Sequence, residues 1–119
     1  MGRKWIKLWV GESLRGTSRF EFTPAERGVW YDLLLMAGDC REDGNISPGD
    51  GKGYPLKWIA STLNIPLPLL KTTLDKCVAS DRLTVTEDGV TINNWRRYQS
   101  EYERQKAHKD RRGVSDKPY

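Results

Sequence analysis

Two apolar stripes at helical spacing follow each other in the middle of the chain, between Pro55 and Leu83. The first predicts a helix over residues 56–63, and the second predicts a helix over Pro68–Ala79. Pro66 separates them, because the residue before a proline is pushed out of the helical region. Two short helices joined this closely bury their stripes by crossing steeply against a third helix, as in a helix-turn-helix. The pattern is equally compatible with the plain core of a small helical domain.

The third helix is predicted to begin at Thr23-Pro24. Thr23 is a suitable cap, Pro24 suits the first helical position, and Glu26 can bond back to the cap backbone. Gly38 is expected to end the helix. The broad apolar stripe in between is typical of the central helix of a three-helix core and comprises Val29, Trp30, Leu33, Leu34, Met36 and Ala37.

Two β-branched runs come directly after the helix pair, at Leu83–Thr86 and Val90–Ile92. Asp-Gly lies in the three residues between them, which predicts a tight hairpin turn. A hairpin after a helix-turn-helix is a wing. With a further short strand expected at Asn45–Ser47, the order is helix, strand, helix, helix, strand, strand, which is that of a winged helix.

The segment Lys4–Val10 (KWIKLWV) is rich in strand-forming residues, and both of its faces are largely apolar. It predicts an additional N-terminal strand that a neighbouring sheet or a second subunit would cover. Gly11–Arg19 is expected to be a polar loop. The candidate oligomer interface on this strand consists of Trp5, Ile6, Leu8 and Trp9.

The predicted class is α+β, mainly α: a winged helix-turn-helix with a three-helix core, a β-hairpin wing, an extra N-terminal strand and a C-terminal charged helix. A chain of 119 residues suits a single modest core, so residues 1–102 are expected to form one domain. Residues 103–119 are basic and lack an apolar stripe, and we expect this extension to be frayed or disordered.

The positive charge of the chain is concentrated near its end. Residues 1–95 carry 12 Lys or Arg against 12 Asp or Glu, whereas residues 96–119 carry 8 against 4, which accounts for the net charge of +4. A basic tail on a neutral body favours a polyanionic partner, nucleic acid first. A solvated helix that only keeps the protein soluble would show the same charge pattern.

A groove-reading helix over Pro68–Ala79 would present polar side chains to duplex DNA, and the tail would add phosphate contacts. Asp75 and the acidic wing tip, Glu87-Asp88, oppose this docking. The candidate DNA-binding residues are Lys71, Thr72, Thr73, Lys76, Arg96, Arg97, Arg104, Lys106, Lys109, Arg111 and Arg112.

Other function classes find little support in the sequence. Cys40 and Cys77 form no CxxC pair and lie far from the single histidine, which argues against zinc and for a reducing, intracellular setting. The loop over residues 39–50 partly matches a calcium loop, but Arg41 occupies a ligand position and Asp50 replaces the final Glu. We expect no metal, no cofactor, no membrane span and no enzymatic activity, because no catalytic constellation is present.

Four stretches together carry a family likeness: KWIKLWV, TPAERGVWYDLLLMAG, GYPLKWIASTLNIPLPLLKTTLDK and INNWRRYQSEYERQK. The chain resembles, from Lys4 to about Lys106, the N-terminal domain of phage replisome-organiser proteins. These are phage replication initiators related to the DnaD-like primosomal proteins of Gram-positive bacteria. NWRRYQSEYERQK is the most specific part.

The resemblance implies a winged-helix domain that binds double-stranded phage-origin DNA in the cytoplasm of a bacterial host cell. It also implies self-association to a dimer or tetramer, and a second, C-terminal domain, missing here, that recruits the host helicase loader or helicase. Two alternatives remain open. The domain could serve assembly only, with DNA contacted elsewhere, or it could belong to a winged-helix transcriptional regulator.

Overall fold

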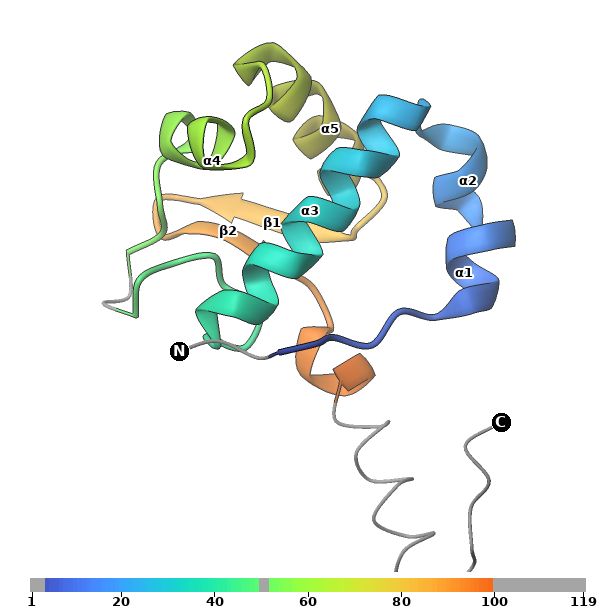
Figure 1. The fold of residues 1–119 in the computed structure, drawn as a ribbon, viewed down its shortest axis with the longest axis horizontal. Helices are drawn as coiled ribbons and strands as arrows, with labels where there is room; N and C mark the ends of the chain where they lie inside the picture. The colour runs from blue at the N-terminus through green and yellow to red at the C-terminus, as the bar shows by residue number, and fades with distance from the viewer. Residues whose placement is uncertain (1–3, 50–51, 100–119) are drawn as a thin grey trace, which may run out of the picture.

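The computed structural model describes residues 4–49 and 52–99 (Figure 1). This part of the chain is mainly helical, with one two-stranded antiparallel sheet, which confirms the α+β, mainly α class. Residues 95–99 are also helical. The elements are α1 (Val10–Arg15), α2 (Thr17–Glu21), α3 (Pro24–Cys40), α4 (Leu56–Leu63), α5 (Leu67–Ala79), β1 (Leu83–Thr86) and β2 (Gly89–Ile92).

Helix α3 crosses the middle of the molecule and begins with the predicted capping box (Figure 1). Thr23 Oγ1 accepts from the Glu26 backbone N–H at 3.2 Å, and Glu26 Oε1 accepts from the Thr23 N–H at 2.7 Å. The expected stop at Gly38 is wrong, because α3 continues to Cys40 and ends at Arg41 in the left-handed region, φ 56°. Gly38 instead admits the side chain of Ile6, with which any Cβ at position 38 would collide.

Helices α4 and α5 form as predicted, with α5 beginning at Leu67. Asn64 ends α4 in the left-handed conformation, φ 58°, and the chain turns at once into α5. Both helices pack above the hairpin, and α5 contacts α3, α4 and β1 (Figure 1). Their buried side chains join one core with those of α3 and the hairpin, including Leu33, Ile59, Leu70, Leu74 and Val90.

The predicted hairpin is present, with Leu83 opposite Ile92 and Val85 opposite Val90. The short strand expected at Asn45–Ser47 is reduced to an isolated bridge between Asn45 and Thr91. The Ile46 N–H donates to Val90 O at 2.8 Å, and Asn45 Nδ2 donates to Thr91 Oγ1 at 2.8 Å. Pro48 and Gly49 then bend the chain away, which prevents a longer ladder.

The predicted N-terminal strand is wrong. Residues 4–9, the N-terminal arm, pair with no strand in the described structure. The side chain of Gln99 takes the place of a partner strand at Lys7: Oε1 accepts from the Lys7 N–H at 3.0 Å, and Nε2 donates to the Lys7 carbonyl at 3.2 Å. A strand needs a neighbouring edge for its backbone groups, and a side-chain amide satisfies one residue only.

The polar loop expected over Gly11–Arg19 is also wrong, since α1 and α2 occupy it. Two arginines hold this region through backbone carbonyls. Arg19 Nη2 donates to Ser13 O at 3.2 Å, and Arg27 Nη1 donates to Arg19 O and Phe22 O at 3.0 Å each. Helices this short are stabilised by such contacts rather than by an apolar period.

Candidate nucleic-acid interface

Helix α5 has one exposed face, formed by Pro68, Lys71, Thr72, Asp75 and Val78. Lys71 and Thr72 therefore lie where a groove-reading helix needs them. The Thr72 hydroxyl donates to the Pro68 carbonyl at 2.9 Å, and its oxygen can still accept a hydrogen bond from a base or phosphate-bound water. Of the four candidates predicted on this helix, these two are at the surface without an ion pair in the described structure.

Thr73 is not an outward-facing residue, contrary to the prediction. It is 0% exposed, and its hydroxyl donates to the Leu69 carbonyl at 2.8 Å. The cause is that α5 is covered on two sides, by α3 and by α4, so that its buried face is wider than one apolar stripe. Thr73 is therefore excluded from the candidate interface.

Lys76 turns from α5 toward the start of α3. Its Nζ lies 2.7 Å from Glu26 Oε1 and 3.0 Å from the carbonyl oxygen of Glu21. Hydrogen bonds from Lys76 and from the Thr23 backbone hold the pKa of the Glu26 carboxyl below its ordinary value of 4.5. The Lys76 side chain is thus engaged within the protein rather than directed at a groove.

The surface beside α5 carries further exposed residues that the sequence did not single out for DNA contact. Lys57 and Trp58 project from α4, and Lys52 from the loop before it. Trp58 is 41% exposed and stacks on Tyr54 with 3.7 Å between ring centroids and 13° between planes. The helical spacing of the apolar residues around Trp58 does not show whether its ring lies in the core or at the surface.

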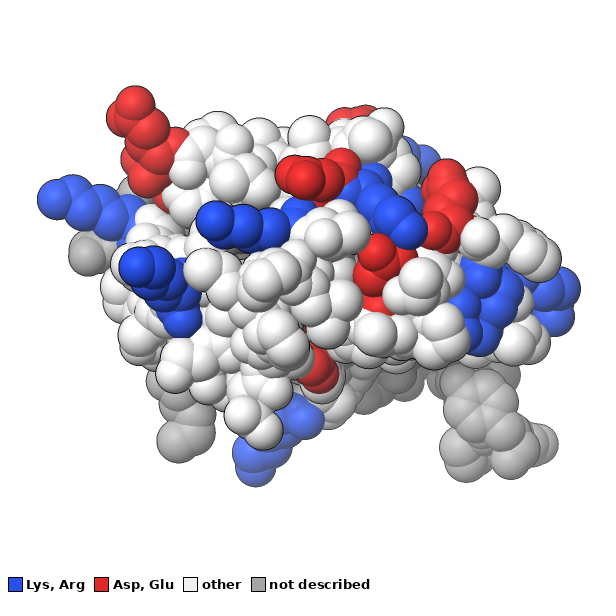
Figure 2. Space-filling view, turned by 90° about the horizontal axis from the view of Figure 1, so that it is seen from above, with Lys and Arg blue, Asp and Glu red and all other residues white. Residues whose placement is uncertain are grey.

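Charges of both signs are interspersed on this face (Figure 2). Lys and Arg side chains project toward the left of the view, where Figure 1 has α4, with acidic side chains close by. At the tip of the β1–β2 hairpin Glu87 and Asp88 are exposed. The potential of this surface is therefore mixed rather than uniformly basic, as the sequence indicated.

Arg96 and Arg97 do not join α5 in one surface. Residues 95–99 lie at the end of the molecule opposite α4 and α5 (Figure 1). Arg96 Nη2 pairs with Asp43 Oδ2 at 3.0 Å, and both side chains are largely exposed. Charge along the sequence grouped Arg96 and Arg97 with the residues of α5, but it does not show on which side of the protein a residue lies. The remaining candidates, Arg104, Lys106, Lys109, Arg111 and Arg112, lie outside the described residues.

Three of the four candidate interface residues of the N-terminal arm are exposed: Trp5 by 51%, Leu8 by 47% and Trp9 by 37%. Ile6 is instead packed against the core beside Gly38. Helices α1 and α2, missed from the sequence, extend this apolar exposure with Val10, Leu14 and Phe20. An oligomer contact would therefore use both segments, not the arm alone.

Neither cysteine has the properties of a reactive or metal-binding thiol. Cys77 is fully buried, and burial raises the pKa of its thiol to about 12. Burial also raises the pKa of Cys40. Across the described residues, no three His, Cys, Asp or Glu side chains are grouped so that they could hold a metal ion.

Among the helices of residues 4–49 and 52–99, none has the length and apolar character needed to cross a membrane. The chain matches none of the protein-family models, curated proteins or solved structures with which it was compared.

Proposed function

We propose that this chain is a winged-helix DNA-binding module that places α5 in the major groove of duplex DNA. The observation that carries the proposal is the position of α5. Its inner face is fixed in the core by Leu70, Leu74 and Cys77, while Lys71 and Thr72 stand on its outer face. Helix α4 precedes it and the β1–β2 hairpin follows it, in the order of a winged helix.

The dimensions of α5 suit this role. Its 13 residues make a rod about 20 Å long. The major groove is about 12 Å wide and admits one α-helix. In this docking Lys71 meets a phosphate or a guanine edge, Thr72 meets a base edge or a thymine methyl group, and Lys57 on α4 meets the flanking backbone.

The mixed charge of the surface limits the strength of binding. Asp75 lies on the same exposed face as Lys71, and Glu87 and Asp88 keep the hairpin tip away from phosphates. With Lys57 and Lys71 as the main phosphate contacts, log affinity falls by about two for each tenfold rise in salt, at about 0.9 per phosphate neutralised. Tight binding then requires several copies of the module on one DNA.

The resemblance to phage replisome organisers supplies the biological setting of the proposal. In that setting the DNA is a phage origin, several copies assemble on it, and a separate domain recruits the host helicase loader or helicase. Each of these steps depends on DNA binding by the module.

The test is fluorescence anisotropy with a labelled duplex at several salt concentrations. Lys57→Ala and Lys71→Ala should each weaken binding and each reduce the salt slope by about one. Arg15→Ala is the matched control, because it removes an exposed cation on α1, away from α4 and α5. If Arg15→Ala weakens binding as much as Lys71→Ala, the helix α5 is not the contact surface.

A second candidate function is self-assembly, favoured by the apolar side chains exposed on the arm, α1 and α2. Phe20 is 79% exposed and Val10 is 71% exposed. Several strongly exposed apolar side chains on neighbouring segments are typical of an interaction surface, whereas single ones are common on any protein. Light scattering on the wild type and on Phe20→Ser should show an oligomer that the substitution dissociates. Leu35→Ser, at an exposed leucine on α3, is the control. A monomer at all concentrations would remove this candidate.

A further inference from the structure

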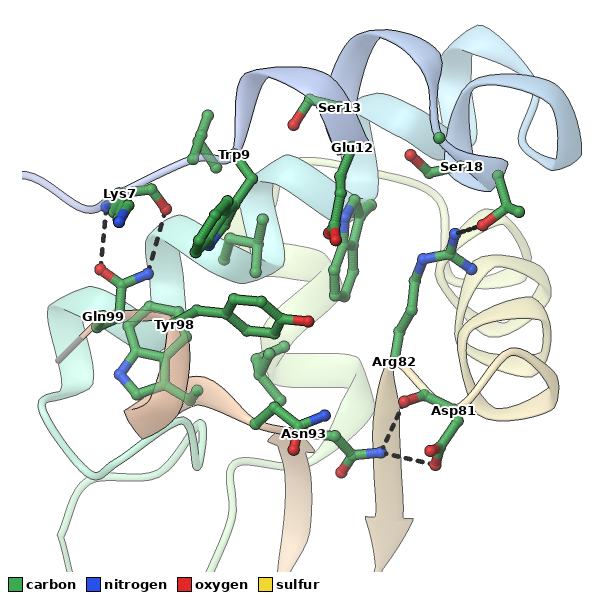
Figure 3. Close-up of a pocket in the computed structure, with 18 residues that line it drawn as sticks. Lys7, Trp9, Glu12, Ser13, Ser18, Asp81, Arg82, Asn93, Tyr98 and Gln99 are labelled. Carbon is green, nitrogen blue, oxygen red and sulfur yellow. Dashed lines mark hydrogen bonds between the residues drawn. The ribbon is translucent and has the colours of Figure 1, made fainter. Parts of the chain in front are cut away.

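A pocket of about 390 Å³ opens between the N-terminal arm, α1, α3 and the segment from β2 to Gln99 (Figure 3). None of its lining residues comes from α4 or α5, so it is separate from the proposed duplex-binding surface. Its volume falls within the range of about 300–1,000 Å³ that small-molecule sites occupy. The lining divides into an aromatic side and a polar side.

The aromatic side is formed by Trp9, Trp30, Trp95 and Tyr98. Trp9 and Tyr98 meet edge to face, with 5.5 Å between ring centroids and 76° between planes. Lys7 Nζ lies 4.4 Å from the centre of the Trp9 ring, and the Gln99 side chain fixes the Lys7 backbone. The rings are thus held in place before any ligand arrives, as a stacking platform requires.

The polar side is built around Arg82, which Figure 3 shows across the pocket from Trp9 and Tyr98. Its Nη2 donates to Thr17 Oγ1 at 2.6 Å, its Nη1 donates to Ser80 Oγ, and its guanidinium lies 4.9 Å from the Phe22 ring centre. Its Nη1 also lies 3.8 Å from Glu21 Oε1, in a long ion pair with a half-exposed carboxylate that an anionic ligand would have to displace, and the Arg82 side chain remains 16% exposed. Ser13 lines the pocket nearby. A preoriented guanidinium beside hydroxyl groups is suited to a phosphate group.

Two further polar residues lie between these sides. Asn93 is positioned by Asp81, because its Nδ2 donates to Asp81 O at 3.1 Å and to Asp81 Oδ1 at 3.2 Å. Glu12 also lines the pocket and is its second acid beside Asp81. Among the described residues of the lining, Lys7 and Arg82 are the cations and Glu12 and Asp81 the acids. The arrangement of these groups, rather than their net charge, suits a ligand with an aromatic part beside the rings and one anionic group at Arg82.

We propose that this pocket binds a single nucleotide unit, with its base against the Trp9, Trp30 and Tyr98 rings and its phosphate at Arg82. The Glu12 carboxylate accepts a hydrogen bond from the exocyclic amino group of the base. Cytosine therefore binds more tightly than thymine, which presents a carbonyl oxygen at the corresponding position. The same unit is found in a free nucleotide and in single-stranded nucleic acid, and comparing dCMP with a short oligo-dC distinguishes these two sources.

The pocket and helix α5 make independent contacts. If the proposed duplex binding by α5 is wrong, the pocket still binds a nucleotide, and the reverse also holds. If both are right, one module can hold a duplex on one surface and an unpaired base on another. A partly opened DNA site offers both of these ligands side by side.

The experiment is calorimetric titration of the full chain with dCMP, dTMP, a short oligo-dC and a duplex. We expect saturable binding of dCMP or oligo-dC and weaker binding of the thymine compound. Tyr98→Leu removes one stacking ring and should weaken binding about 5- to 150-fold. Glu12→Gln, at an exposed position on α1 where folding is least affected, should lose most of the preference for cytosine over thymine.

The controls are Trp58→Leu, which removes an exposed ring outside the pocket, and Glu42→Gln, which neutralises an exposed acid outside it. Both should leave dCMP binding unchanged. If oligo-dC binds and dCMP does not, the ligand is single-stranded nucleic acid. If dCMP binds as tightly as one site on oligo-dC, the free nucleotide is sufficient as the ligand.

The proposal is overturned by either of two results. One is the lack of saturable binding to dCMP and to oligo-dC. The other is binding that neither Tyr98→Leu nor Glu12→Gln alters while circular dichroism shows both variants folded. Lys71→Ala serves as a separate arm, since it should reduce duplex binding and leave dCMP binding intact.

Discussion

Lys76 on α5 and Glu26 on α3 form an ion pair with 2.7 Å between Nζ and Oε1. The same Oε1 accepts the Thr23 backbone N–H at 2.7 Å. The carboxylate that caps α3 therefore also fixes the rotation of α5 about its axis, and with it the direction in which Lys71 and Thr72 point. Glu26 is 4% exposed, so little water competes for these hydrogen bonds.

We expect Lys76→Met to lower the free energy of unfolding by about 1–3 kcal/mol, because it leaves the buried Glu26 carboxylate without its cationic partner. Lys71→Met on the exposed face of the same helix should change the free energy of unfolding by less than about 0.5 kcal/mol. Urea unfolding followed by tryptophan fluorescence measures both variants. Equal effects of the two substitutions would show that the ion pair contributes nothing.

Stability should fall in acid through Glu26. Its carboxyl has a lower pKa in the folded protein than the ordinary value of 4.5, so the unfolded chain binds the proton more readily. The contribution is complete above the ordinary pKa and is lost as pH falls through the folded pKa. Urea midpoints measured from neutral to acidic pH should decline less steeply for Glu26→Gln, which keeps an acceptor for the Thr23 N–H. An unchanged slope would assign the acid sensitivity to other carboxyls.

Two glycines of α3 should respond to alanine in opposite directions. A methyl group at position 28 would meet no neighbouring heavy atom within 4 Å, so Gly28→Ala should stabilise the helix by about 0.8–1 kcal/mol. Gly38→Ala would collide with Ile6, so it should lose about 1–3 kcal/mol by overpacking. Thermal unfolding measures both, and adding Ile6→Ala to Gly38→Ala should recover part of the loss. Stabilisation by Gly38→Ala alone would mean that the arm is not seated on α3.

Removing the amide of Gln99 should release the N-terminal arm with little effect on the core. Gln99→Ala loses two hydrogen bonds to Lys7, each worth about 0.5–1.5 kcal/mol. Hydrogen exchange at the Lys7 amide should accelerate, while exchange at Leu33 in the core stays slow. Gln99→Glu retains only the acceptor and should give an intermediate rate. Uniform acceleration at both amides would indicate global destabilisation instead.

The parts of the fold that the sequence predicted are those with local signals. The Thr23–Glu26 capping box, the break at Pro66 and the Asp-Gly turn each depend on residues a few positions apart, and all three are present. The N-terminal arm has strand-forming residues but no strand edge beside it. Its partner at Lys7 is a side chain 92 positions away, which no local pattern encodes.

The candidate interface was predicted less completely than the fold. A helical pattern separates an inner from an outer face, but it cannot show that α5 is flanked by both α3 and α4, which buries Thr73. It also cannot show that Lys76 would pair with Glu26, or that Arg96 would lie at the far end of the molecule. The pocket combines residues from four separate stretches of the chain, 7–18, 30–34, 81–82 and 92–99, so no spacing in the sequence predicts it.

The clasp between Gln99 and Lys7 bears on how the protein is made. The ribosome makes Lys7 early, whereas the Gln99 amide that bonds the Lys7 backbone follows 92 residues later. Until Gln99 is made, the backbone of Lys7, which lies between Trp5 and Trp9, lacks these hydrogen bonds, while the helices that precede Gln99 can already pack. Lys7 therefore gains its side-chain partner late in synthesis, and a chain terminated before Gln99 would keep the exposed tryptophans of the arm without this anchor.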